Sequence, residues 1–412
     1  MVATPPRRVV VTRFDPPPAS TSRHDAPDQV VAAPARARND AVDWLRGAVM
    51  VLMALDHTRG FLGTPVELET AAPALFFTRW VTHFCAPVFV FLAGMGAYMH
   101  GRRLASPGAL SAYLAKRGLW LVLLEITVVR FAWTLRIGVD GLFLQVIWVI
   151  GVSMVVLAAL VWLPRAAIAA FALLLIGGHD LFDGVHADGL GAARWLWVVL
   201  HEPGVLSPFP NAGWFVLYPL VPWVGVMAAG HALGPWALLP RDERRTRFMR
   251  LGAALIVGFV VLRATNLYGD PQPWSTDHGV VRALLGFLDC RKYPPSLLYL
   301  TMTLGPALCV LAWIDRPLDT PMRWVLLYGR VPLFYYVLHM LLIHLVAVAA
   351  AWPALGSAAL AYPFMPEGGL RYPLPVVYVL WIAIVAALYL PCRWFAGVKR
   401  RNAANAPWLS YL

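Results

Sequence analysis

Ten long apolar stretches, separated by polar segments, limit what this chain can fold into. Most are close to the roughly 20 residues that an α-helix needs to cross the hydrocarbon core of a bilayer. Backbone groups cannot stay unpaired in lipid, so helices are the economical way to span it. We therefore predict an all-α integral membrane protein, a polytopic bundle of about ten transmembrane helices. The stretches cover residues 41–63, 80–99, 112–136, 141–163, 165–180, 213–233, 248–268, 296–314, 323–350 and 375–396.

The composition agrees with a membrane protein and excludes other classes. Hydrophobic residues make up 59% of the chain and charged residues 14%, whereas soluble domains carry about 25% charged residues. The net charge of +12 is spread along an apolar chain, which is not typical of disordered or nucleic-acid-binding proteins. The four cysteines are widely spaced, so we expect neither a disulfide framework nor a metal site.

The chain divides into three predicted parts. Residues 1–40 are rich in Pro, Ala and Arg and lack apolar periodicity, so we predict a disordered tail. Residues 41–398 form the transmembrane domain, and residues 399–412 form a C-terminal tail. Most Arg and Lys residues outside the apolar stretches fall on one side of this arrangement, which predicts that both termini are cytoplasmic. The fifth stretch, 165–180, is short, and the sequence leaves open whether it crosses fully.

The first apolar stretch carries ionisable residues, which are costly in lipid and therefore mark candidate functional sites. Asp43 and Arg46 are three residues apart on a helix and can pair. Arg46 and His57 are eleven residues apart, so they share a helix face at roughly 16 Å along the axis. This stripe would connect a ligand at the inner end to chemistry at the outer end.

Further polar residues are expected at the outer end of the bundle. Tyr335 and His339 are four residues apart and share a face of the ninth stretch. Several such residues at one depth predict a polar cavity that opens to the outer face. Besides these two, the candidates are Asp56, Arg59, Arg79, His83, Arg130, Lys292 and Tyr293.

These residue types fit two kinds of chemistry. A neutral His is the usual general base and can carry an acyl group, while Arg and Lys bind anions or stabilise an oxyanion. This combination is typical of acyl transfer, but it also fits a proton-coupled transporter that relays protons through His and acidic groups. A membrane scaffold without turnover is a third alternative. The spacing of His57, His83 and His339 does not match a zinc motif.

Five sequence blocks resemble a known family. The blocks are VDWLRGAVMVLMALDHTRGFL, THFCAPVFVFLAGMGAYM, YPLVPWVGVMAAGHALG, KYPPSLLYLTMTLGPAL and GRVPLFYYVLHMLLIHL, within residues 39–398. They resemble bacterial membrane proteins, once grouped as a domain of unknown function, that are related to the catalytic domain of lysosomal heparan-α-glucosaminide N-acetyltransferase. The first block also resembles the wider transmembrane acyltransferase superfamily, in which an Arg precedes the catalytic His by about three turns.

The resemblance implies a bundle of ten or eleven helices in the bacterial cytoplasmic membrane. It implies acetyl-CoA as a donor bound from the cytoplasmic side and a saccharide of the cell envelope as the acceptor on the outer face. The lysosomal enzyme has its reactive His in the loop after its first span, but residues 58–82 contain no His here. The assignment of His57 therefore follows the O-acyltransferase pattern.

These observations lead to one hypothesis, an acyltransferase that uses acetyl-CoA or a similar short acyl-CoA. His57 would be the base or acyl carrier, Asp56 its orienting partner and His339 the second choice as base. Arg46, paired with Asp43, would bind the donor. The predicted acceptor-binding residues are Arg59, Arg79, His83, Arg130, Lys292, Tyr293 and Tyr335. The expected partners are the lipid bilayer, the CoA thioester and the acceptor, with a homodimer as an open option.

Overall fold

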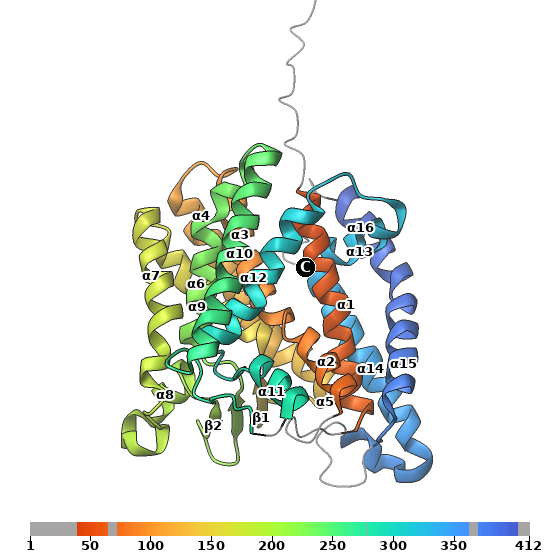
Figure 1. The fold of residues 1–412 in the computed structure, drawn as a ribbon. Coiled ribbons are helices and arrows are strands. Elements are labelled where there is room, and N and C mark those ends of the chain that lie inside the picture. Colours follow the sequence, from red (N-terminus) through yellow and green to blue (C-terminus); the bar gives the residue numbers. More distant parts are fainter. Residues whose placement is uncertain (1–38, 65–71, 278, 362–369, 403–412) are drawn as a thin grey trace, which may run out of the picture. The chain divides into compact units, whose positions relative to one another are not determined.

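The computed structural model describes residues 39–64, 72–277, 279–361 and 370–402, and it is mainly helical (Figure 1). The predicted tails at 1–40 and 399–412 lie mostly outside these residues. The α-helices of the first half are α1 (Asp40–Leu62), α2 (Pro73–Thr82), α3 (Cys85–Gly101), α4 (Pro107–Leu124), α5 (Arg130–Thr134), α6 (Val146–Leu160), α7 (Arg165–Gly178), α8 (Arg194–Leu200) and α9 (Leu220–Ala232). The second half contains α10 (Arg241–Thr265), α11 (Gly279–Leu288), α12 (Leu297–Ile314), α13 (Thr320–Arg330), α14 (Pro332–Leu355), α15 (Leu374–Ala387) and α16 (Tyr389–Arg401).

Short helical turns and strands connect these helices. A π-helical turn, η1 (Glu125–Val129), joins α4 to α5. The 3-10 turns are η2 (His179–Phe182), η3 (Ala187–Ala193), η4 (Gly234–Leu238) and η5 (Gly356–Ala361). The strands are β1 (Gly141–Leu144), β2 (Gly204–Leu206) and β3 (Gly213–Val216).

Six helices in the described residues are long and apolar enough to cross a membrane, which supports an integral membrane protein. They are Pro73–Gly101, Arg165–Phe182, Arg241–Thr265, Leu297–Ile314, Pro332–Ala361 and Leu374–Arg401. The fifth predicted stretch is among them. The helix α1 is not, because it carries charged residues near both ends. Ten spans and the cytoplasmic position of both termini remain predictions.

The helices α7, α10 and α15 expose apolar faces. In the candidate spans that contain them, Arg165–Phe182, Arg241–Thr265 and Leu374–Arg401, only 17%, 22% and 17% of the most apolar 18 residues are buried. The side chains of Leu173, Val261 and Val379 are more than half exposed. Exposed apolar faces of this size are unfavourable in water but are the ordinary outer surface of a membrane bundle. These helices therefore form the lipid-facing surface in our interpretation.

A small sheet corrects the all-helical prediction. The strand β3 pairs in parallel with β1 and antiparallel with β2, so residues 141–144 and 213–216 are strands although they begin two stretches predicted as helices. The spacing of apolar residues does not distinguish a short buried strand from the first turn of a helix. Pro219 immediately precedes α9 and disfavours helical geometry at the residue before it.

The stretch 323–350 also differs from the prediction, because it forms two helices. The helix α13 ends at Arg330, and α14 begins at Pro332. Val331 lies between them in a non-helical conformation with φ −133° and ψ 50°. Proline lacks the backbone N–H of a continuous helix and restricts the preceding residue. The break therefore follows directly from the Val-Pro sequence.

Glycine pairs bring neighbouring helices into close contact. A Cβ atom built on Gly94 in α3 would lie 2.0 Å from the Met227 carbonyl oxygen in α9, and one on Gly230 would lie 2.0 Å from the Phe91 oxygen. Small residues allow such close helix packing in membranes. Gly94 is such a packing position, whereas Gly96, two residues later, has no neighbour within 4 Å of such an atom. Similar pairs join α1 to α13, α4 to α6 and α10 to α12, through Gly47 and Gly329, Gly118 and Gly151, and Gly252 and Gly305.

The helix α1 positions the first group of polar residues. Asn39 caps it, since its side-chain oxygen accepts hydrogen bonds from the backbone N–H groups of Ala41 and Val42. The helix packs against α13, α14 and α15 on one side and against α3 and α12 on another. Its C-terminal end lies where the strands and α2, α5 and α11 gather (Figure 1). His57 is in the last two turns of α1, and so it lies at this end of the bundle.

Candidate functional site

Two histidines from distant parts of the chain form the centre of the candidate site. His57 Nδ1 on α1 lies 2.8 Å from His339 Nε2 on α14. The two rings are nearly parallel, with an interplanar angle of 3° and centroids 5.0 Å apart. His339 is fully buried and His57 is half-buried. The structure thus joins the first-choice and second-choice bases into one pair.

A contact with a backbone carbonyl determines which ring nitrogens of this pair carry hydrogens. His339 Nδ1 lies 2.9 Å from the Tyr335 carbonyl oxygen one turn earlier in α14. A carbonyl only accepts, so His339 Nδ1 carries the hydrogen and its Nε2 has the lone pair. His57 Nδ1 must then donate to His339 Nε2. In the neutral pair, the lone pair of His57 is on Nε2, which has no hydrogen-bond partner within the described part of the chain.

Aromatic rings surround the histidine pair. Trp133 meets His57 edge to face, with centroids 5.2 Å apart, and Tyr336 lies in a similar edge contact with both histidines. Tyr335 stacks on His339 at 5.1 Å, which confirms that these two residues share a helix face. The rings restrict the orientation of the His57 side chain to the one that faces His339.

Asp56 makes different contacts from those expected. Its Oδ1 atom accepts hydrogen bonds from Arg59 at 3.1 Å and from the Thr82 hydroxyl at 3.0 Å. The predicted role of Asp56 was to orient His57, but in the structure the His57 ring donates its hydrogen bond to His339. Asp56 acts on His57 through its charge alone. Thr82 belongs to the site although the sequence analysis did not select it.

Lys292 and Tyr293 approach the same region from the segment before α12. The Lys292 Nζ atom lies 5.2 Å from the centre of the Tyr293 ring, and the Tyr293 hydroxyl lies 3.4 Å from that of Tyr218. Burial lowers the pKa of Lys292, but Tyr293 and the Asp56 carboxylate outweigh this effect, so the pKa is raised above its ordinary value. Lys292 is therefore a cation at neutral pH.

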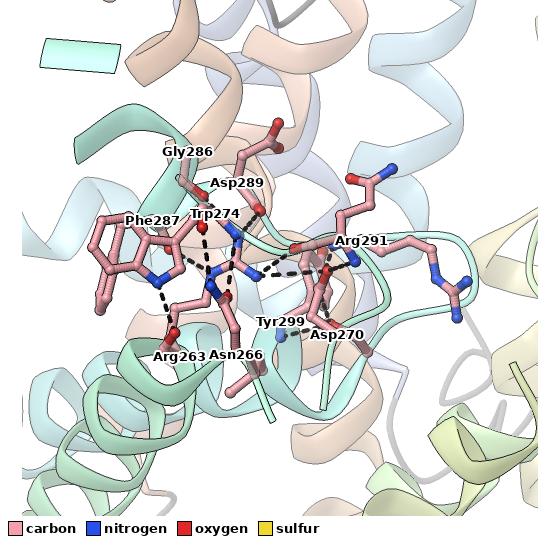
Figure 2. Close-up of polar contacts among 12 residues, drawn as sticks. Arg263, Asn266, Asp270, Trp274, Gly286, Phe287, Asp289, Arg291 and Tyr299 are labelled. Carbon is pink, nitrogen blue, oxygen red and sulfur yellow. Dashed lines mark hydrogen bonds and ion pairs between the residues drawn. The ribbon is translucent and has the colours of Figure 1, made fainter. Parts of the chain in front are cut away.

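A polar network holds the segment that carries Lys292 (Figure 2). The buried guanidinium of Arg263 in α10 donates hydrogen bonds to four backbone carbonyls, those of Gln272, Gly286, Phe287 and Asp289. Five N–H donors in a rigid plane suit this arrangement. The network fixes the backbone that leads into residues 290–296. Arg263 was not among the predicted site residues, although its charge within an apolar stretch was a usable signal.

Asp270 continues this network to the start of α12. Its Oδ2 atom accepts from the Arg291 backbone N–H at 2.8 Å and from the Ser296 hydroxyl at 2.7 Å. The Ser296 oxygen in turn accepts from the Tyr299 backbone N–H and caps α12. The backbone on both sides of Lys292 is therefore anchored to one carboxylate.

His83 is buried in the same region without hydrogen-bond partners. It is 3% exposed, and neither of its ring nitrogens is bonded within the described residues. Its ring lies 5.5 Å from that of Tyr299, and the charges of Lys292, Arg79 and Asp56 act on it. The predicted candidates Arg79, His83 and Lys292 thus come together.

With this geometry in place, comparison with known families is informative. A family model described as "heparan-alpha-glucosaminide N-acetyltransferase, catalytic" matches residues 38–265. The match covers more than half of the chain. The chain belongs to this family. No curated protein matches the chain.

The family match covers one part of the site directly. Among the residues described above, His57, Asp56, Arg59, Thr82 and His83 lie within the matched region. Lys292, Tyr293 and His339 lie beyond residue 265, and the structure alone brings them to these residues. Of the two paired histidines, His57 lies inside the matched region and His339 lies outside it.

The expected donor-binding pair is at the opposite end of α1 from His57. Arg46 lies 3.0 Å from Asp43 Oδ1, which confirms the predicted ion pair, and it also donates to the Gly329 carbonyl at 3.4 Å. These contacts join α1 to α13. Donor binding by Arg46 and Asp43 remains a prediction.

Arg130 is occupied by local contacts. Its guanidinium donates to the Gly141 and Arg136 carbonyls and to the Asp140 carboxylate, at 2.7, 3.0 and 2.7 Å. These bonds tie α5 to the start of β1. The sequence analysis placed Arg130 in acceptor binding, but its described contacts hold the loop between those elements.

Tyr335 was also predicted to bind the acceptor. Its ring packs against His339, and its hydroxyl is buried without a partner in the described residues.

Proposed function

We propose that this protein is a membrane-embedded acyltransferase that moves an acetyl or other short acyl group from acyl-CoA to a saccharide amine or hydroxyl. The proposal includes a cytoplasmic donor, an acceptor on the outer face and a location in the bacterial cytoplasmic membrane. Family membership supports acetyl transfer over the proton-coupled transporter considered from the sequence. The observation that carries the proposal is the His57–His339 contact, which leaves the lone pair on His57 Nε2.

The proposed reaction follows from this lone pair. His57 Nε2 accepts the proton of the attacking amine or hydroxyl, and the acceptor forms a bond to the thioester carbonyl carbon. The carbon–sulfur bond then breaks, and His57 returns the proton to the leaving thiolate. His339 supports the imidazolium that forms in between, because it accepts the Nδ1 hydrogen throughout. An alternative with the same residues is attack by Nε2 itself to give an acyl-histidine.

The site offers a thioester donor a base at one end of α1 and a charged pair at the other. The unpartnered base at His57 is the group that such chemistry needs, and Trp133 and Tyr336 contact its ring edge to face. Arg46 and Asp43 remain our candidates for the donor's charged end. At the helix rise of 1.5 Å per residue, Arg46 lies roughly 16 Å from His57 along the axis of α1.

The test uses the full chain in liposomes with acetyl-CoA labelled on the acetyl group. We would measure release of CoA and bound label for the wild type, His57→Ala and Arg136→Gln. The Arg136 side chain is exposed, and this variant controls for loss of one positive charge elsewhere. With water as the acceptor, we expect slow CoA release in the wild type and the control and a loss of at least about 100-fold in His57→Ala. Equal turnover in all three would refute the assignment of His57.

A further inference from the structure

His179, immediately after α7, faces hydrogen-bond acceptors with both of its ring nitrogens. The Nδ1 atom lies 3.0 Å from the Leu175 carbonyl oxygen and 3.1 Å from that of Ile176. The Nε2 atom lies 2.9 Å from the Pro295 carbonyl oxygen, just before α12. A carbonyl oxygen only accepts, so each nitrogen must carry a hydrogen. Because a neutral imidazole has only one such hydrogen, these contacts require the charged imidazolium.

A buried carboxylate lies beside this ring. Asp180 Oδ1 is 3.0 Å from His179 Nε2, and the two side chains are 3% and 0% exposed. A buried charge is costly unless an opposite charge and hydrogen bonds compensate it. Asp180 supplies the opposite charge, and its other oxygen accepts a hydrogen bond from the Leu297 backbone N–H at 2.9 Å. The two residues thus form a buried ion pair that the proposed reaction does not use.

This ion pair connects the end of α7 to the turn that carries Lys292. His179 donates to Pro295, and Asp180 holds the first residue of α12, Leu297. The backbones of Lys292 and Pro295 form an isolated bridge. If His179 Nε2 lost its hydrogen, its lone pair would face the Pro295 carbonyl oxygen, and an attractive contact would become repulsive. The proton on His179 therefore contributes to the position of this turn.

The other ionisable groups around His179 have partners of their own. Asp183 forms an ion pair with Arg291 and lies 3.5 Å from the His201 Nε2 atom. The His201 ring, at the end of α8, is 6.1 Å from that of His179. The Tyr268 hydroxyl donates to a backbone carbonyl at the end of α7. Within the described residues, none of these groups is hydrogen-bonded to His179, so their contacts do not depend on its hydrogens.

We propose that His179 is a positioning residue, held as an imidazolium, whose two hydrogens fix the turn that carries Lys292. This inference goes beyond the proposed function, because it concerns a residue outside the reacting groups and holds for any chemistry at His57. The turn is held while His179 is protonated. It loosens as the pH rises through the titration of His179, because one of the two carbonyl contacts is then lost.

The protonation state can be measured directly. We would record ring ¹⁵N spectra of the full, histidine-labelled chain in lipid at pH 7.5, where a histidine in water is mostly neutral. His179 is assigned by its loss in His179→Phe, or in His179→Gln if the first variant does not fold. We expect both nitrogens of His179 to be protonated. One protonated and one unprotonated nitrogen would overturn the proposal.

Backbone hydrogen exchange tests the effect on the turn. In nanodiscs at the same pH, His179→Phe should speed exchange of the Leu297 amide by about tenfold or more. His179→Gln can keep one donor near the position of Nε2 and should speed this exchange less. Amides of α14 should exchange as in the wild type in both variants, and Arg136→Gln should leave all of these rates unchanged.

The pH dependence separates the charge of His179 from its packing. In the wild type, protection of residues 291–297 should fall over the pH range in which the ¹⁵N spectra show His179 losing a proton, after correction for the intrinsic exchange rate. His179→Phe should show no such step. Constant protection of the wild type through that titration would overturn the proposal, and so would wild-type exchange in His179→Phe that thermal unfolding shows to be folded.

Discussion

At the residue scale, the contact between His57 and His339 determines how the site can react. His339 accepts a hydrogen bond at Nε2 because its Nδ1 hydrogen is donated to the Tyr335 carbonyl oxygen. His57 is therefore held as the tautomer whose base faces away from His339. Of all the described contacts at the site, this one has the most direct chemical consequence.

Two substitutions of His339 separate orientation from packing. Gln can keep an acceptor oxygen near the position of the His339 Nε2 atom, whereas Leu cannot. We expect His339→Leu to lower kcat by about 100-fold and His339→Gln by clearly less, with little change in KM for the donor. Turnover of acetyl-CoA in liposomes measures both. Equal losses in the two variants would mean that His339 matters only for its shape.

The charge of Lys292 gives a prediction for pH dependence. Its pKa in the folded protein is raised above the ordinary 10.5, so the favourable interactions of the cation are fully present below pH 10.5 and are lost only as the pH rises through the higher folded value. The contribution of Lys292 to the free energy of unfolding should therefore stay constant between pH 7 and pH 9, and the wild type and Lys292→Gln should differ by the same amount in thermal unfolding across this range. A difference that shrinks steadily from pH 7 to pH 9 would contradict a cationic Lys292.

The sequence predicted the members of this site better than their contacts. His57, His339, Asp56 and Lys292 were all selected, because ionisable residues in apolar stretches are rare. The pairing of His57 with His339 was not predictable, since the two lie 282 residues apart and helical periodicity gives only the face of each helix. Thr82 was missed for the same reason, because a threonine is common in sequence and its contact with Asp56 appears only in the folded structure.

At the element scale, close helix crossings hold α1 and its neighbours in register. The reciprocal glycine pairs allow backbone contact at four crossings. Packing of α1 against α13 and α14 sets the position of His57 relative to His339. The geometry of the site therefore depends on small residues that have no chemical role.

Two glycines that are two residues apart in α3 offer a matched test of this packing. Gly94→Ala would place a methyl group against the Met227 carbonyl oxygen, while Gly96→Ala would meet no atom within 4 Å. We expect Gly94→Ala to lower the free energy of unfolding by about 1–3 kcal/mol. Gly96→Ala should be neutral or stabilising, because Ala is the better helix former. Thermal unfolding in detergent measures both, and equal effects would refute the crossing.

Sequence periodicity located the helices but not their ends. The break before Pro332 was readable from the proline, yet the apolar residues on both sides suggested one continuous helix. The strands β1 and β3 were hidden because their few apolar residues adjoin longer apolar helices. Pairing between β1 and β3 joins segments about 70 residues apart, and such non-local contacts leave no local signal.

At the scale of the whole molecule, the described helices place apolar surface outward and charge at one end of α1. The outward faces of α7, α10 and α15 would contact lipid. The cluster around His57 would face the outer side if both termini are cytoplasmic, as the distribution of Arg and Lys predicts.

Cysteine labelling tests the lipid-facing surface. Leu173→Cys, Val261→Cys and Val379→Cys in reconstituted protein should resist a charged, water-soluble maleimide, because a thiol that faces lipid stays protonated, and they should react once the protein is unfolded in detergent. Arg136→Cys, at an exposed loop position, should react in both states, and the wild type gives the background of the four native cysteines. Rapid reaction of all three apolar positions with the charged reagent would show that these faces contact water.

The hydrogen on His57 Nδ1 connects these scales. Helix packing holds His57 against His339, and the proposed chemistry uses the lone pair on the other His57 nitrogen, Nε2. We would measure the ring ¹⁵N shifts of histidine-labelled protein in lipid by solid-state NMR, and assign His57 by its loss in His57→Gln. A neutral ring with the hydrogen on Nδ1 and the lone pair on Nε2 is the predicted result. A neutral His57 with its hydrogen on Nε2 would contradict the account.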